Sequence, residues 1–467
     1  MLSDDGFLRN YHRTVSVEAR DDGTWLATER ITYRLAIPYF WWFFAVPLWL
    51  ALRRPPWKGP AWWMPTDRFD ARTTTVLATL AAAAVVAGYL NTLFSETATF
   101  AADEFHVSNT VQGVTGGIVR VAGIAAFVIA AAADRRGRRT ILLRTTAAGC
   151  ALAAIGAVAP SFAWLGGSQA LARAFATAML IVLEIVAVEE MPARSRAFAL
   201  SLLAMAFALG AGFCVMALRL ADLGVRGWRL IYVMPLLGLL LLPGIARRLP
   251  ESRRFAAPHV EAPFRGHGRR LLLLAASLLL LNLYAGPSSQ FFNRFLKHER
   301  HYTGGGIALI TILTSTPAAM GLIVGGVVAD RRGRRAVAAV SLVAGIILTA
   351  AIYYTFHWEM WLMSMVGTIV FAASGPALAV YGPELFPTSL RGRVNGIIGI
   401  AGLTGSAIGL VVAGVLSDHF GRVGPAMAIL ASGPILLAAL VIAFYPETAG
   451  QELEQLNPED AAPAPTG

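Results

Sequence analysis

Charged residues and cysteines are both scarce in this chain. Only 14% of its 467 residues are Asp, Glu, Lys or Arg, and its 2 cysteines are Cys150 and Cys214. Soluble domains carry about a quarter charged residues, so this composition argues against an ordinary soluble protein. Both cysteines lie inside apolar runs, so a disulfide framework is not expected.

Several chemical signatures are also missing from the sequence. No nucleotide-binding loop of the form G-x-x-x-x-G-K-[ST] occurs, which argues against ATP drive within this chain. No group of nucleophile, base and metal ligands stands out, so we expect no enzyme activity, cofactor or metal. His298 and His301 lie beside charged neighbours without a further ligand, which favours a solvated outer loop over a metal site.

Long apolar runs are what the chain has in abundance. Hydrophobic residues make up 56% of it, and its mean hydropathy is +0.60. A helix of about 20 apolar residues crosses the roughly 30 Å hydrocarbon core of a bilayer, and backbone groups in lipid must be satisfied within the segment. The sequence therefore predicts an all-α membrane protein. Its twelve predicted spans are residues 74–97, 109–132, 140–159, 164–188, 197–218, 228–246, 271–293, 304–329, 336–355, 359–382, 395–417 and 425–445.

The basic residues indicate the topology. The net charge is +11, and if the loop at 134–144 is cytoplasmic, the cytoplasmic loops hold 20 basic residues against 7 on the opposite side. This is the positive-inside bias of membrane proteins, so the charge is a topology signal and not evidence of nucleic-acid binding. We expect both termini in the cytoplasm, the protein in the cytoplasmic membrane, and no secretory signal before the first span.

One charged motif occurs twice. "DRRGRR" stands at 134–139 and at 330–335, an offset of 330 − 134 = 196 residues. "EEMPARSR" (189–196) corresponds to "PELFPTSLR" (383–391), and "PESRRF" at 250 to "PETAG" at 446. Three motifs in one order at nearly one offset indicate two copies of a six-helix unit. The predicted parts are an N-terminal extension (1–73), a first bundle (74–248), a central loop (249–270), a second bundle (271–445) and a tail (446–467).

These motifs resemble those of the major facilitator superfamily. "GGVVADRRGRR" (325–335), "YGPELFPTSLRGR" (381–393), "GWR" (227–229) and "PETAG" (446–450) are similar to signatures of its sugar porter and metabolite–proton symporter branch. The resemblance covers roughly residues 74–450. It implies two pseudo-symmetric six-helix bundles around a central cavity, and transport of a small organic solute by alternating access.

The resemblance also implies a cytoplasmic charge network that closes the inner gate and separates when the protein opens inward. Asp134 would dock near the start of the span after Arg391, and Asp330 near the start of the span after Arg196. The other implied members are Arg135, Gly137, Arg138, Glu189, Glu251, Arg254, Arg331, Gly333, Arg334, Glu384 and Glu447. From the residues alone, glycine permits a tight turn and aspartate can approach a helix N-terminus. A solvated loop that only sets topology is the alternative.

Few ionisable residues lie inside the predicted spans. Arg120 and Arg173 lie near the middles of the second and fourth spans, Glu96 near the outer end of the first, and Glu184 near the inner end of the fourth. An arginine at the bilayer centre costs about 3 kcal/mol or more, so it usually faces a cavity or a partner. Two such arginines favour a carboxylate-bearing solute over a neutral sugar.

Glu96 shares a polar helix face with Asn91, which predicts that both point inward. We expect a pair between Glu96 and Arg120 or Arg173. It is either a structural salt bridge or a proton-binding carboxylate whose protonation depends on whether substrate engages the arginine. Sugar porters commonly place an Asp after a Gly-aromatic pair in the first span, where this chain has Leu90. Either Glu96 replaces that acid or proton coupling is absent.

The seventh span also carries polar residues. "LNLYAGPSSQFFNRF" (281–295) contains Asn282, Tyr284, Gln290 and Asn293 around a Gly-Pro pair at 286–287. This predicts a broken helix that exposes polar groups to a midplane site. A kinked helix with an ordinary polar outer end is the alternative.

The two ends of the chain differ from the spans. Residues 14–34 alternate around "DDG" and predict a β-hairpin. Residues 35–52 are expected to lie at the membrane interface, with a thirteenth span or a re-entrant segment as alternatives. The tail is polar and rich in Pro and Ala, and is expected to be disordered.

The sequence thus predicts a monomeric transporter in the lipid bilayer that takes up a small carboxylate-bearing or sugar-like solute with a proton. Export of drugs ranks second, because "ALGAGFCVMA" (208–217) lacks the Gly-Pro pair of the family's antiporters. A transporter-like sensor and a membrane enzyme are the remaining alternatives.

Overall fold

Twelve helical segments are long and apolar enough to cross a membrane, as the sequence predicts. The computed structural model describes residues 8–19, 21, 24–35, 37–53, 69–192, 195–249, 251, 267–381, 385–386 and 390–447. The first six segments are α2 (Ala71–Glu104); α3 (Asn109–Ala122) with α4 (Ala125–Ala131); α6 (Arg138–Ile155) with η2 (Gly156–Val158); α7 (Phe162–Glu190); α8 (Arg196–Ala217) with η4 (Leu218–Leu223); and α9 (Trp228–Val233), α10 (Pro235–Leu239) and α11 (Leu242–Arg248).

The second six segments repeat this plan. They are α12 (Gly268–Arg294) with the π-helical turn η5 (Phe295–Glu299); α13 (Gly304–Ser315) with α14 (Ala318–Arg332); α15 (Arg334–Ala351) with η6 (Ile352–Tyr354); α16 (His357–Ala372) with α17 (Ser374–Ala379); α19 (Arg391–Phe420); and α20 (Val423–Leu430) with α21 (Ser432–Phe444). The short helix α5 (Ala133–Arg136) lies in the first repeated loop.

Polar caps fix where several spans begin. The side chains of Asp70, Ser108, Ser161 and Thr303 each accept a hydrogen bond from a backbone N–H in the first turn that follows. Such a cap satisfies one of the N–H groups that a helix leaves without an internal partner. Ser108 and Thr303 occupy corresponding positions in the two halves, before α3 and α13.

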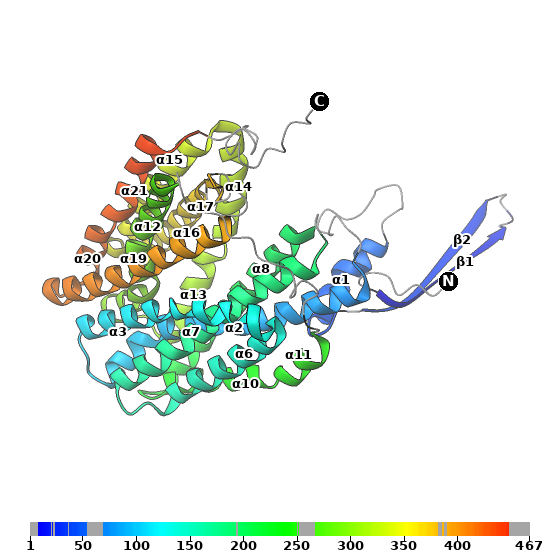
Figure 1. Ribbon diagram of the computed structural model, residues 1–467, viewed down its shortest axis with the longest axis horizontal. Helices are drawn as coiled ribbons and strands as arrows, with labels where there is room; N and C mark the ends of the chain where they lie inside the picture. The colour runs from blue at the N-terminus through cyan, green and yellow to red at the C-terminus, as the bar shows by residue number, and fades with distance from the viewer. Residues whose placement is uncertain are drawn as a thin grey trace.

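The two bundles meet at one end and diverge towards the other (Figure 1). At the meeting end α3 and α19 lie side by side, whereas α8 and α14 lie apart at the other. We call the end that carries the two "DRRGRR" loops the inner end, because it is the predicted cytoplasmic side, and the opposite end the outer end.

Glycines permit the closest packing inside the second bundle. A Cβ on Gly405 would lie 2.2 Å from the carbonyl oxygen of Leu279, and one on Gly409 would lie 2.2 Å from that of Leu283. Only glycine tolerates this distance, so α19 packs with its backbone against α12. Both glycines of α19 lie in the eleventh predicted span, residues 395–417.

The seventh span differs from its prediction, because α12 is a continuous helix with Pro287 inside it. Proline leaves the carbonyl four residues earlier, that of Leu283, without its helical donor. This carbonyl lies against Gly409 of α19, and the hydroxyl of Ser289 donates to the Gly286 carbonyl at 2.8 Å. The helix thus stays continuous and packs against α19 at the proline, and the predicted break is wrong.

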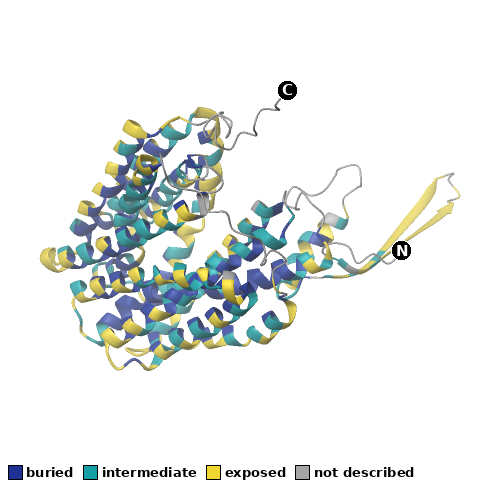
Figure 2. Cartoon of the chain, in the orientation of Figure 1, coloured by how far each residue is buried: buried dark blue, intermediate teal, exposed yellow. Residues whose placement is uncertain are grey.

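The N-terminal extension consists of a projecting hairpin and a short helix that packs against the first bundle. Strands β1 (Leu8–Ala19) and β2 (Trp25–Leu35) form the predicted antiparallel hairpin, which projects from the inner end and is exposed along most of its length (Figure 2). Helix α1 (Trp41–Leu52) has 12 residues, about 18 Å at 1.5 Å per residue, which is too short to cross a bilayer. Leu48 and Ile37 pack against Ala78 of α2. The interfacial location of this segment stays a prediction, and the tail after residue 447 lies outside the described residues.

Candidate functional site

Two arginines lie at mid-span, and one of them, Arg120, contacts both bundles. Nη2 of Arg120, on α3, donates to the Ser95 hydroxyl of α2 at 3.2 Å and to the Ser289 hydroxyl of α12 at 2.9 Å. Nη1 of Arg173, on α7, donates to the backbone carbonyl of Asn91, and its Nε is buried without a hydrogen-bond partner. The two arginines thus reach α2 four residues apart, at Ser95 and at Asn91.

Neither arginine has a carboxylate within 4.0 Å among the residues that the structure describes. Their oxygen partners are all neutral, so two half-buried positive charges remain without a counter-ion. Buried charges are usually paired, because the desolvation of an ion is costly. The arrangement is therefore suited to binding an anion.

Asn91 supports this site from α2. Its backbone carbonyl accepts from Arg173, and its Oδ1 accepts from the Thr177 hydroxyl at 3.1 Å. Its side-chain amide donates to the Ala87 carbonyl at 2.9 Å. Asn91 thus fixes the guanidinium relative to α2, and Thr177 is a member of the site that the sequence reading did not include.

Glu96 has a different partner from the one expected. Its Oε2 accepts from Nδ2 of Asn293 at 2.8 Å, and its backbone carbonyl accepts from the same nitrogen at 3.0 Å. Asn293 lies on α12, so these hydrogen bonds join the two bundles. The predicted pair between Glu96 and an arginine is wrong for this conformation, since the carboxylate is turned towards α12.

The predicted polar residues of the seventh span are mostly covered. Tyr284, Gln290 and Asn293 are 3%, 1% and 2% exposed, and the Asn282 amide donates to the Leu278 carbonyl of its own helix at 2.9 Å. Gln290 donates to the backbone carbonyl of Gln112, on α3, at 3.1 Å. Gln290 and Asn293 therefore join the bundles in this conformation and do not face an open cavity.

The outer loop between spans seven and eight contacts the first bundle. Nζ of Lys297 lies 2.6 Å from Oδ2 of Asp103, and Nε2 of His298 lies 3.0 Å from Oδ1. Asp103 ends the first span, so this contact also crosses between the bundles. His298 and His301 are exposed, as expected for a solvated outer loop, and α2, which extends to Glu104, brings a carboxylate to this loop.

At the inner end the repeated motifs form matching contacts within each bundle. Arg138 Nε lies 2.6 Å from Glu189, and Glu251 accepts from the backbone N–H groups of Arg138 and Arg139 at 2.6 and 3.2 Å. In the second bundle Glu447 accepts from the N–H groups of Arg334 and Arg335 at 2.9 and 3.2 Å. The two glutamates therefore cap the N-termini of α6 and α15.

The predicted contacts between bundles at the inner end are not formed among the described residues. The Asp330 side chain is 71% exposed, and its ion-pair partner is Arg334, 3.5 Å away on the neighbouring helix. Arg135 and Arg331 are exposed, and Arg196 is half-buried. The side chains of Asp134 and Arg391, together with Arg254 and Glu384, lie outside the described residues.

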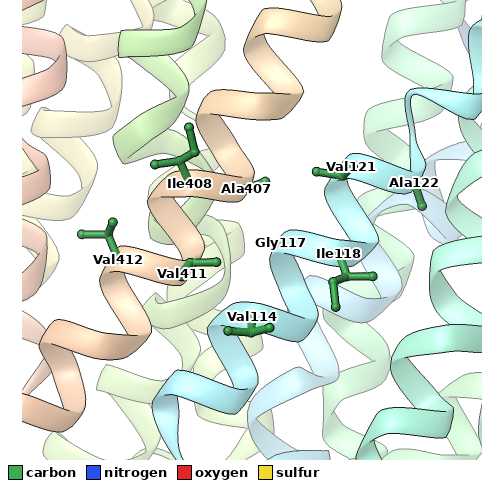
Figure 3. Close-up of a pocket in the computed structure, with 9 residues that line it drawn as sticks. All are labelled: Val114, Gly117, Ile118, Val121, Ala122, Ala407, Ile408, Val411 and Val412. Atoms are coloured by element: carbon green, nitrogen blue, oxygen red, sulfur yellow. The ribbon is translucent and has the colours of Figure 1, made fainter.

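An apolar groove of about 630 Å³ lies between α3 and α19 (Figure 3). Its walls carry no charged or polar side chain and come from both bundles. The lining residues are Val114, Gly117, Ile118, Val121, Ala122, Ala407, Ile408, Val411 and Val412.

Within the described residues, no group of three or more His, Cys, Asp or Glu side chains could hold a metal.

Comparison with known proteins gives one family. Residues 79–303 and 272–466 match the family model described as Major Facilitator Superfamily. A curated relative, the probable 4-methylmuconolactone transporter of Cupriavidus pinatubonensis, is 28% identical over 293 residues, covering 58% of this chain and 67% of that protein.

Solved transporter structures share the fold. The inward-open xylose transporter XylE from E. coli aligns with a TM-score of 0.70 at 15% identity, over 83% of this chain and 99% of that one. A bacterial homologue of the human lysosomal transporter Spinster, inward-facing and occupied, aligns with a TM-score of 0.68 at 17% identity, over 83% and 98%.

Proposed function

The chain belongs to the Major Facilitator Superfamily, and from this premise we propose that it moves a small carboxylate-bearing organic solute across the membrane by alternating access, coupled to a proton. The observation that carries the proposal is the pair Arg120 and Arg173, which lie inside spans and donate to neutral oxygens alone. A carboxylate on the solute would supply the missing counter-ion through charge-assisted hydrogen bonds.

The position of the pair supports transport. Arg120 touches α2 of one bundle and α12 of the other, so a ligand held there contacts both halves. Arg173, Thr177 and Glu184 follow one face of α7, spaced by four and seven residues, and Glu184 is exposed. These side chains place polar groups at the level of the arginines and nearer the inner end.

The relatives support the solute class. The curated relative is named for a small organic lactone, and one solved structure of the same fold is titled a D-xylose–proton symporter. We propose that the solute is taken up together with a proton and that Glu96 binds this proton. A sugar-like solute that carries an acid group falls within the same solute class.

Thermal stabilisation of the purified protein tests the proposal. The panel contains carboxylates including 4-methylmuconolactone, neutral sugars, amino acids and amphipathic cations. A ligand present at about 100 times its Kd stabilises the folded state by about 2.7 kcal/mol. We expect carboxylates to raise the Tm of the wild type and to lose this effect in Arg173→Ala.

The matched control is Leu171→Ala, on the same helix, where the side chain is 56% exposed and points away from the Arg173 face. It should respond to carboxylates like the wild type. Stabilisation by amphipathic cations alone, unchanged by Arg173→Ala, would contradict the proposed solute class. Uptake into proteoliposomes under a pH gradient then separates a transporter from a sensor.

A second candidate function is export of amphipathic compounds. It is favoured by the apolar groove between α3 and α19, whose Val114 and Ile118 are 38% and 56% exposed. A compound dissolved in the bilayer reaches such a wall without crossing water. Proton-driven extrusion of amphipathic cations from loaded vesicles would place this function first.

A further inference from the structure

Two aspartates join the bundles at the outer end. Asp418, near the end of α19, accepts from the backbone N–H groups of Asn109 and Thr110 at 3.0 and 2.7 Å. Asp222, in η4, accepts from the N–H groups of Gly304 and Gly305 at 2.6 and 2.8 Å. Each carboxylate therefore bonds two of the free N–H groups that begin a helix, α3 in one case and α13 in the other.

The two contacts are copies of each other. Their offset is 418 − 222 = 196 residues, the same as that of the two "DRRGRR" motifs. Asp222 belongs to the first bundle and bonds the second, whereas Asp418 belongs to the second and bonds the first. The pseudo-symmetry of the fold thus places one carboxylate from each bundle on a helix N-terminus of the other.

The helices also touch backbone to backbone at these points. A Cβ on Gly304 would lie 2.3 Å from the Leu218 carbonyl oxygen, and one on Gly414 would lie 2.4 Å from that of Asn109. Charge-assisted hydrogen bonds and the helix dipole both favour a carboxylate at such an N-terminus. Separation of the bundles at the outer end must break all four hydrogen bonds.

We propose that Asp222 and Asp418 are positioning residues for transport, a pair of outer latches that hold the outer end closed while the inner end is open. The inference rests on the proposed alternating access. Opening to the outside requires both latches to release, so they set the balance between the two states.

Distances between spin labels at the outer end test the proposal without any solute. Labels on Val158→Cys and Trp358→Cys report the separation of the bundles, since these outer-end positions are 73% and 69% exposed in different bundles. The native Cys150 and Cys214 are buried and free. We expect Asp222→Asn and Asp418→Asn each to raise the ratio of long to short distances by roughly tenfold, and the double variant to raise it further.

The matched control is Glu299→Gln. Glu299 also accepts from a helix N-terminus at the outer end, the N–H of Val423 at 2.7 Å, but within one bundle. It should leave the distance distribution unchanged even where the Tm falls. An unchanged distribution in both aspartate variants, or an equal change in Glu299→Gln, would overturn the proposal.

Gly304→Ala and Gly414→Ala give a second route if the aspartate variants do not fold. Each added methyl group wedges a contact between the bundles and should also lengthen the outer distances. If neither does, the proposal fails. These distance measurements need no solute, so they remain valid even if the proposed solute class is wrong.

Discussion

Glu96 links the candidate solute site to the contact between the bundles. It lies on α2, five residues after Asn91, is 8% exposed, and accepts from Asn293 on α12. An ionised carboxylate accepts a stronger hydrogen bond than a protonated one. A proton taken up at Glu96 would therefore weaken a contact that holds the outer end closed, which gives the proposed coupling a physical route.

The prediction at this residue is that Glu96→Gln uncouples transport from the proton. Glutamine keeps the shape and an acceptor for Asn293 but has no titrating group. Accumulation driven by a pH gradient should be lost in proteoliposomes, while exchange of labelled for unlabelled solute continues.

The matched control for that experiment is Glu184→Gln, which alters the other carboxylate inside a span. It should still accumulate solute under a pH gradient, because glutamine keeps a polar side chain on that face of α7. Accumulation by Glu96→Gln at the wild-type level would remove Glu96 from the coupling, and loss in Glu184→Gln alone would move the coupling site to α7.

The sequence alone identifies the charged residues of the predicted spans, because charge inside lipid is rare. They are Arg120, Arg173, Glu96 and Glu184. The residues that these side chains contact could not be predicted in the same way. Asn293 lies 197 positions after Glu96, and the sequence does not set how α2 and α12 are rotated against each other. Asp222 and Asp418 were missed although they have the offset of the repeated motifs, since a single aspartate at each site is a weaker signal than a six-residue run.

At the scale of elements, the repeated loops follow their sequence closely. Gly137 and Gly333 have φ of +88° and +100°, and each lies beside the glutamate that caps the next helix. The sequence predicted this tight turn because only glycine favours such a conformation. It did not predict the continuous α12, because the neighbour that accommodates Pro287 belongs to α19, a helix more than one hundred residues later.

Alanine at either loop glycine should destabilise the protein. The new Cβ would lie 2.6 Å from Glu251 Oε2 at position 137, and 2.8 Å from Glu447 Oε2 at position 333. The unfavourable φ alone costs about 1–3 kcal/mol. We expect Gly137→Ala and Gly333→Ala to lower the Tm by similar amounts, measured by thermal unfolding in detergent.

Gly212→Ala serves as the control, since nothing lies within 4 Å of a Cβ on that residue of α8. It should leave the Tm unchanged or raise it slightly, because alanine favours a helix more than glycine does. An equal loss of Tm at position 212 would show that the loop geometry is not the cause.

For the whole molecule, the twelve spans and the two-bundle fold were predictable because the bilayer fixes helix length and the repeat fixes their grouping. The relative position of the bundles was not. Between described residues, the hydrogen bonds and ion pairs that cross between the bundles run from Arg120 at mid-span to Asp222 and Asp418 at the outer end. The inward-open and outward-open states differ by a few kcal/mol and form different contacts between the bundles. The sequence composition does not indicate which of the two states is more stable.

Because the contacts between the bundles lie at mid-span and at the outer end, we expect reagents to reach the space between the bundles from the inner side of the membrane. A membrane-impermeant maleimide should label Glu184→Cys from the inner face of sealed vesicles and not from the outer face, because the contacts between the bundles close the outer end. Leu171→Cys, on the opposite face of α7, should stay unlabelled in lipid, and the buried Cys150 and Cys214 give no background.

Adding Asp222→Asn together with Asp418→Asn should slow the labelling of Glu184→Cys from the inner face, because the two changes favour the state that is open outward. Labelling of Glu184→Cys from the outer face in the wild-type background would contradict the inward opening and, with it, the assignment of the two aspartates as outer latches.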